Sequence, residues 1–235
     1  MGVGKKMRRI EEQEIQELLL VNRNYLYQLF YKAFGREPDE AFWDILMGES
    51  TRRGLLLLEE GPSLVGPALE ALGRIGQEEG FLERAREEYI RLFVGPMEME
   101  APPWESVYLG KEGMLFQEST LQVRAFYRAF GLRTLEYRRV PDDSLALELG
   151  FLAELAKRSV DALGRGEAEE LESLLKGSRD FLAEHLLQWS PRLLDRVEKT
   201  DSRIYIELMR LLNAFLARDR ETVEELLRKG VYANA

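Results

Sequence analysis

Residues 81–96 read FLERAREEYIRLFVGP, and this stretch decides the fold class. Its apolar residues recur at steps of three and four, which places them on one face of an α-helix. These residues are Leu82, Ala85, Tyr89, Leu92 and Phe93. Gly95 and Pro96 follow directly and are typical of a helix end. The stretch therefore predicts an amphipathic helix over 81–94 that buries one face.

The same spacing continues on both sides of this stretch, and no alternating strand pattern persists. It predicts further helices over 11–33, 39–47, 62–75, 116–130, 141–163, 167–189 and 201–229. Residues 48–61 look looser, and Ser190-Pro191 is expected to separate the last two helices. We predict an all-α fold, a single globular domain of about eight to ten helices over 11–230. A flexible basic tail at 1–10 and a candidate hinge at 131–141 complete the predicted organisation.

Composition excludes several classes of function. The formal net charge of −9 argues against a nucleic-acid backbone as the main partner. The chain has no cysteine, so disulfides and thiolate chemistry are excluded, and the single histidine, His185, excludes multi-histidine metal sites. No apolar run approaches the roughly 20 residues that span a bilayer. Because the basic N-terminus runs into Glu11 and Glu12 rather than an apolar segment, we expect no export signal and a cytoplasmic location.

The longest irregular stretch is predicted at 97–115, and it holds Pro103, Trp104 and Tyr108. A compact helical domain rarely keeps a long loop without a functional reason. Prolines fix an extended backbone, and the two aromatic side chains offer flat apolar area with a polar edge. The segment therefore suits binding of an apolar peptide. The alternative is that Trp104 is a core plug that holds the loop down.

Residues 141–144, Pro-Asp-Asp-Ser, allow two interpretations. Asp142, Asp143 or Ser144 can cap the following helix by accepting a hydrogen bond from a free backbone N–H. The functional alternative is a carboxylate pair that, with Glu148 one turn later, receives a cationic partner. His185 shares a helical face with apolar residues and Trp189, where a histidine is usually a hydrogen-bonded core residue.

Four segments together resemble one family. Residues 88–96 (EYIRLFVGP) resemble its E-Y-x-x-L-F-x-G-P signature, and residues 103–108 (PWESVY) its P-x-E-S-V-Y loop. Residues 141–152 (PDDSLALELGFL) resemble its P-D-H-x-x-x-E-L-x-F-L motif, and residues 181–191 (FLAEHLLQWSP) its F-x-x-x-H-L-x-x-W-x-P segment. The four occur in the family's order. They are similar to those of the TorD/DmsD/NarJ redox-enzyme maturation chaperones.

The resemblance implies an all-α, non-enzymatic chaperone. Its partner would be the leader or N-terminal peptide of a molybdopterin oxidoreductase catalytic subunit, typically a twin-arginine leader. The chaperone would aid cofactor insertion and delay export. Asp143 stands where the family commonly has histidine, so a fixed anion replaces a titratable imidazole. This departure removes the basis for carrying over a role of that histidine.

Together these observations give a peptide-site hypothesis. An apolar floor would be joined to carboxylates that face the leader's arginines, because guanidinium forks bind carboxylates in a bidentate way. We expect no catalytic residue, metal or cofactor, and we place His185 and Trp189 beside the site as structural residues. The predicted peptide-binding residues are Tyr89, Leu92, Phe93, Pro103, Trp104, Ser106, Tyr108, Asp142, Asp143 and Glu148.

Three alternatives remain open at this point. The first is a NarJ-like assembly chaperone whose client is not exported. The second is an all-α Mg²⁺-dependent enzyme of the isoprenoid type, which the Asp142-Asp143 pair suggests although a second aspartate-rich motif is missing. The third is a general helical adaptor. The chain could be a monomer or a domain-swapped dimer.

Overall fold

A computed structural model describes residues 3–57, 64–95, 98–110, 118–134 and 141–230, with side chains from residue 11 onward. Its elements are α1 (Val3–Gly35), α2 (Glu40–Leu46), α3 (Glu49–Leu56), α4 (Val65–Ile75), α5 (Phe81–Tyr89), η1 (Ile90–Val94), α6 (Glu105–Leu109), α7 (Glu118–Ala129), α8 (Leu145–Arg165), α9 (Ala168–Phe181), η2 (Leu182–Leu186), α10 (Leu187–Val197) and α11 (Ile204–Lys229). The all-α prediction is confirmed.

Two π-helical turns, η1 and η2, continue α-helices without a break. The first extends α5 to Val94, and the second connects α9 to α10. Counted as continuous helices, the described part of the chain has ten, within the predicted range. Gly95 ends the first of these helices with a positive φ of 56°, a conformation that favours glycine.

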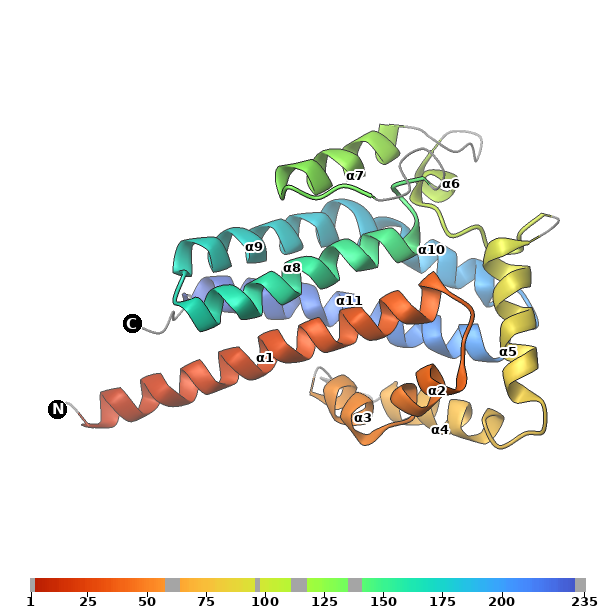
Figure 1. Cartoon of the computed structure of the whole chain (residues 1–235), viewed down its shortest axis with the longest axis horizontal. Helices are drawn as coiled ribbons and strands as arrows, with labels where there is room; N and C mark the ends of the chain where they lie inside the picture. The colour runs from red at the N-terminus through yellow and green to blue at the C-terminus, as the bar shows by residue number, and fades with distance from the viewer. Residues whose placement is uncertain (1–2, 58–63, 96–97, 111–117, 135–140, 231–235) are drawn as a thin grey trace.

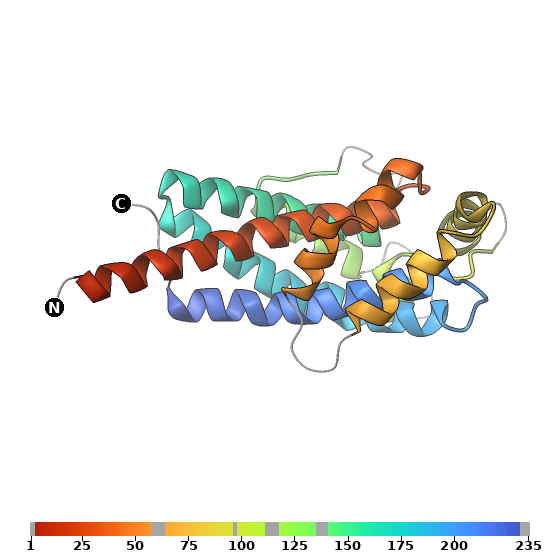
Figure 2. The same ribbon diagram turned by 90° about the horizontal axis from the view of Figure 1, so that it is seen from below.

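Four long helices, α1, α8, α9 and α11, lie side by side along the long axis of the molecule (Figures 1 and 2). Helix α5 crosses one end, α2 to α4 cover one side, and α6 and α7 lie on another (Figure 1). Leu26, Phe30, Leu152, Leu175 and Leu212 are among the buried side chains that these helices share. This arrangement buries the apolar stripes that the sequence predicts and leaves α6 and α7 at its edge.

Helix α1 differs from its prediction in two ways. It begins at Val3 rather than Glu11, so most of the expected tail 1–10 is helical. The cause is local: straight-chain Lys, Met, Arg and Glu residues favour helix, and no glycine or proline interrupts them after residue 4. The first turns of α1 project beyond the other helices (Figures 1 and 2). Ile15 and Leu18, which share the apolar spacing of the buried Leu26, are therefore 57% and 51% exposed.

Three local predictions are wrong. The looser stretch 48–61 contains α3, whose Thr51 and Leu55 are buried. The irregular stretch 97–115 contains the short helix α6. Ser190-Pro191 does not separate two helices, because Pro191 lies inside α10. A proline ring crowds the carbonyl four residues earlier. Here that residue is Leu187, which directly follows the π turn, where the helical hydrogen-bond pattern is already altered.

An ion pair joins α1 to α11 inside the bundle. Arg23 and Asp219 are both fully buried, with Arg23 Nε 2.6 Å from Asp219 Oδ1, and Tyr27 donates its hydroxyl to Asp219 Oδ2 over 2.6 Å. Charges buried in this way need a partner, so the pair fixes the register between the two helices. Among the described helices, none is long and apolar enough to cross a membrane.

Candidate functional site

Asp143 ties the start of α8 to α6 and α7. Its carboxylate accepts hydrogen bonds from the backbone N–H of Ser106 at 2.8 Å and from the Thr120 hydroxyl at 3.0 Å. Its backbone carbonyl accepts from the N–H of Glu105 at 2.9 Å. Two of the free N–H groups at the start of α6 are therefore satisfied by one residue of a different segment. Asp143 therefore does for α6 what an N-cap residue usually does, although it lies in a segment remote in the sequence.

Two more contacts complete this junction. The N–H of Leu145 donates to the carbonyl of Pro103 at 2.9 Å, and Trp104 forms an isolated antiparallel bridge with Ser144. Ser144 is also the N-cap of α8, because its hydroxyl accepts from the N–H of Leu147 at 3.3 Å. The capping interpretation of residues 141–144 is confirmed for Ser144.

A buried polar cluster lies behind α6. His185 Nδ1 is 3.1 and 3.0 Å from the two carboxylate oxygens of Glu105, and Trp189 Nε1 donates to Glu148 Oε2 at 3.1 Å. All four residues are at most 1% exposed. Within the described part of the chain, His185 Nε2 and Glu148 Oε1 have no hydrogen-bond partner. The expected structural role of His185 and Trp189 fits these contacts.

The carboxyl group of Glu148 has an unusual environment. Burial, and then the neighbouring Glu105 carboxylate, raise the pKa of Glu148 well above its usual range. A protonated Glu148 donates a hydrogen bond, and the adjacent Glu105 carboxylate is an acceptor for it. The surroundings of Glu148 therefore favour its protonated form.

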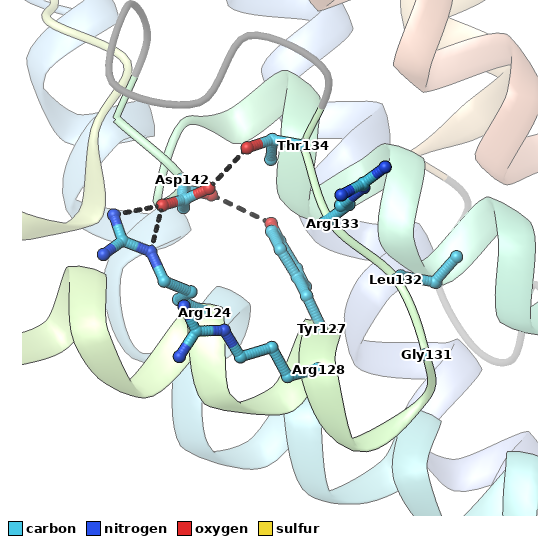
Figure 3. A pocket seen from close by; sticks show the side chains of 8 residues that line it. All are labelled: Arg124, Tyr127, Arg128, Gly131, Leu132, Arg133, Thr134 and Asp142. Atoms are coloured by element: carbon cyan, nitrogen blue, oxygen red, sulfur yellow. Dashed lines mark hydrogen bonds and ion pairs between the residues drawn. The ribbon is translucent and has the colours of Figure 1, made fainter.

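Asp142 forms an ion pair with Arg124 of the same chain. Its Oδ2 lies 2.7 Å from Arg124 Nε and 2.5 Å from Arg124 Nη2, and its Oδ1 accepts from the Thr134 hydroxyl at 2.8 Å (Figure 3). The Tyr127 hydroxyl donates to the backbone carbonyl of Asp142 at 2.9 Å. A hollow of about 580 Å³ opens beside this pair, with Arg128 and Arg133 in its wall.

The three predicted carboxylates are thus not available as expected. Asp142, Asp143 and Glu148 are each at most 3% exposed, and each is engaged inside the protein. In this structure none of them faces an incoming arginine. A sequence shows that acidic residues are close together, but it does not show which internal donors they have.

The predicted apolar floor divides into two groups. Tyr89, Leu92 and Phe93 lie in the core, where the Phe93 ring packs edge-on against Phe34 and Tyr205. Their helical face is the one that packs into the bundle, so they form no floor open to solvent in this structure.

Pro103, Trp104 and Tyr108 are instead half-buried at the molecular edge. The Tyr108 ring stacks on Trp189 with centroids 5.6 Å apart, and burial raises the pKa of its hydroxyl. Ser106 is fully buried and contributes its backbone N–H to Asp143. These three residues, all predicted to bind peptide, are therefore partly accessible, and Trp104 is not the fully buried core plug of the alternative interpretation.

Sequence reasoning missed three residues of this junction. Glu105 lies inside the motif at 103–108, but the sequence did not show that its side chain is buried. Thr120 and Arg124 lie on α7 outside any motif, and no local signal connects them to Asp143 and Asp142. In the described part of the chain, no group of three or more His, Asp or Glu side chains could hold a metal ion.

Comparison with known proteins supports one family. Residues 62–195 match the family model described as "Nitrate reductase delta subunit". The chain is 30% identical over 223 residues to the chaperone protein TorD of Vibrio cholerae, covering 92% of this chain and 99% of that protein. It is also 30% identical over 135 residues to the probable Tat proofreading chaperone DmsD of Haemophilus influenzae, covering 57% and 59%.

A solved structure is also similar, that of a putative redox enzyme maturation protein from Archaeoglobus fulgidus. It is 22% identical, covers 83% of this chain and 93% of its own, and has a TM-score of 0.46. The family model and the full-length relative, together with the four motifs, of which three meet around α6, give the assignment. The chain belongs to the TorD/DmsD/NarJ family of redox-enzyme maturation chaperones.

Proposed function

We propose that this chain is a cytoplasmic, system-specific chaperone that binds the twin-arginine leader of a molybdopterin oxidoreductase catalytic subunit. By holding the leader it would delay export until the cofactor is inserted. The names of its relatives, a TorD chaperone and a Tat proofreading chaperone, support the class of partner. Asp142 and Asp143 are engaged in internal hydrogen bonds, so the alternative of a Mg²⁺-dependent enzyme loses the motif that suggested it.

The observation that carries the proposal is how α6 is held. Buried hydrogen bonds to Asp143 and the Glu105–His185 pair fix the segment 103–108 without burying its aromatic side chains completely. The side chains of Trp104 and Tyr108 are therefore half-buried, and the backbone that carries them is held in place by buried hydrogen bonds. A preorganised aromatic surface binds an apolar peptide stretch at a low entropy cost.

The role of charge differs from the sequence-based hypothesis. Asp142 binds an arginine in the described structure, but this arginine is Arg124 of the chain itself. Direct pairing with a leader arginine would require Arg124 to leave. Attraction of a basic leader then comes mainly from the net charge of −9, which raises the association rate at low salt.

Calorimetry of the full chain with the twin-arginine leader peptide of a molybdopterin oxidoreductase catalytic subunit from the same genome tests this proposal. We expect tighter binding than for a scrambled peptide of the same composition. Tyr108→Ala should weaken binding at every salt concentration, whereas Leu121→Ala, at a side chain 60% exposed on α7, should not. Circular dichroism of both variants separates lost binding from unfolding. Equal affinity for leader and scrambled peptide would refute leader recognition.

A NarJ-like role is the second candidate, and the description of the matching family model favours it. In this case the client's N-terminus need not be an export signal. Comparing a twin-arginine leader with the N-terminal peptide of a non-exported molybdoenzyme distinguishes the two. A leader chaperone should bind the first peptide more tightly, whereas a NarJ-like chaperone should bind the second more tightly.

A further inference from the structure

The hollow beside Asp142 is basic, although the chain as a whole is acidic. Figure 3 shows Arg124, Arg128 and Arg133 around the Tyr127 side chain. Asp142 neutralises Arg124. Arg128 and Arg133 are exposed, and neither side chain has a hydrogen bond or ion pair within the described residues. Two guanidinium groups are therefore left free to bind an oxyanion.

A second hollow of about 600 Å³ adjoins the first. The two share Tyr127, Leu132, Arg133 and Thr134 in their walls. The second wall is largely apolar and comes from α1 and α8, with Tyr31, Leu147 and Phe151. Its carboxylate Glu154 pairs with Arg158 at 2.9 Å, so it does not neutralise Arg133.

The backbone between the hollows is open to pairing. Residues 132–134 belong to no helix. Leu132 donates its N–H to the carbonyl of Tyr127 at 2.8 Å, whereas among the described residues Arg133 and Thr134 make no backbone hydrogen bond. Unpaired backbone groups of this kind can bond to an extended peptide laid alongside them.

We propose that these two hollows form one groove that binds an extended segment of a partner protein, with an acidic side chain on Arg128 and Arg133 and an apolar side chain against Tyr31 and Leu147. Charge complementarity selects this occupant. A twin-arginine segment is repelled by the free guanidiniums, so the groove is a site separate from the proposed leader surface at Trp104 and Tyr108. The inference therefore does not depend on leader binding.

Two features favour a peptide over a free anion. The basic and apolar hollows share a wall, so a ligand filling both must carry both kinds of group. Asp142 lies in the basic hollow and disfavours a compact ion with two negative charges more than a single carboxylate. Side chains of an extended peptide alternate in direction, which allows neighbouring residues to enter different hollows.

Nuclear magnetic resonance of the full, ¹⁵N-labelled chain tests the proposal through the arginine Nε–Hε signals. The probe is the acetylated, amidated peptide Gly-Asp-Glu-Gly-Leu-Phe-Gly. Its controls are the analogue with Asn-Gln in place of Asp-Glu, the analogue with Ser-Ser in place of Leu-Phe, and inorganic phosphate. We expect the acidic peptide to shift signals in wild type and to bind roughly ten-fold more weakly to the Arg128→Gln/Arg133→Gln variant.

The Arg52→Gln/Arg74→Gln variant is the charge-matched control, because both arginines are exposed on α3 and α4, away from the groove. It should bind the peptide as wild type does. The proposal is wrong if the acidic peptide shifts no signal at millimolar concentration, or if the Asn-Gln analogue binds as well. It is also wrong if phosphate or the Ser-Ser analogue matches the probe, because the groove then recognises an oxyanion alone.

Discussion

His185 Nδ1 lies 3.0 Å from Glu105 Oε2, across 80 positions of the chain, and both side chains are fully buried. The pair joins the π turn η2 to the first residue of α6. Glu148 and Trp189 extend the same cluster into α8 and α10. The edge surface at Trp104 and Tyr108 is therefore supported by polar groups that the protein has removed from water.

We expect His185→Ala to lower the free energy of unfolding by about 3–5 kcal/mol, because it leaves a buried carboxylate without its partner. Glu184→Ala, at the exposed neighbouring position, should change it by less than about 0.5 kcal/mol. Urea denaturation followed by circular dichroism measures both. Hydrogen exchange at the Ser106 amide should accelerate only in the first variant. A loss below about 1 kcal/mol would mean that the pair is not a stabilising element.

The stability of the protein should depend on pH through Glu148. The pKa of this carboxyl is raised in the folded state, so between the unfolded value, near 4.3, and the folded value the native state holds more protons. Stability from this group is thus fully present below the unfolded pKa and is lost as pH rises through the folded pKa. Glu148→Gln mimics the protonated acid and should flatten the decline.

Urea midpoints of wild type and Glu148→Gln at several pH values measure this effect. We expect the variant to gain stability relative to wild type as pH rises. Glu154→Gln, at a side chain 37% exposed and paired with Arg158, serves as the control and should leave the slope unchanged. Parallel curves for wild type and Glu148→Gln would show that Glu148 is ionised in the folded protein over the whole range.

Most helices could be predicted because apolar periodicity is a local property of the chain. Helix α2 shows this well: its predicted start coincides with Asp39, whose side chain accepts from the N–H of Phe42 at 2.7 Å. Pro191 shows the opposite. Its local rule predicts a break, but the π turn that precedes α10 changes the backbone around it.

The site was harder to predict for a different reason. The motif around residues 141–144 identifies the right region, but the partners of its carboxylates come from α6 and α7. A sequence shows that Asp142 and Asp143 are adjacent. It cannot show that one accepts bonds from Arg124 and the other from Ser106, because those contacts depend on tertiary packing. In this structure burial gives both residues internal partners, and their role in peptide binding stays a prediction.

Gly177 and Gly164 differ in the space that an added Cβ atom would find. A Cβ atom at Gly177 would lie 2.1 Å from the ring of Phe130, whereas one at Gly164 would meet nothing within 4 Å. Gly177→Ala should therefore destabilise the protein by about 1–3 kcal/mol, because the Phe130 ring must move. Gly164→Ala, in the helix α8, should stabilise it by about 0.5–1 kcal/mol by restricting the unfolded chain. Thermal denaturation decides both, and a loss at Gly164 would contradict the open space around it.

The Arg124–Asp142 pair should behave as a coupled unit. Arg124→Gln leaves a carboxylate that is 4% exposed without its cation, and the free energy of unfolding should fall by about 1–3 kcal/mol. This is less than for a fully buried pair, because Arg124 is 21% exposed and water compensates part of the loss. Adding Asp142→Asn to the Arg124→Gln variant should lower the free energy of unfolding little further, because neither residue then carries a charge. A double-mutant cycle by urea denaturation gives the coupling energy, and additive losses would mean that Asp142 is held by Thr134 and the backbone rather than by its arginine.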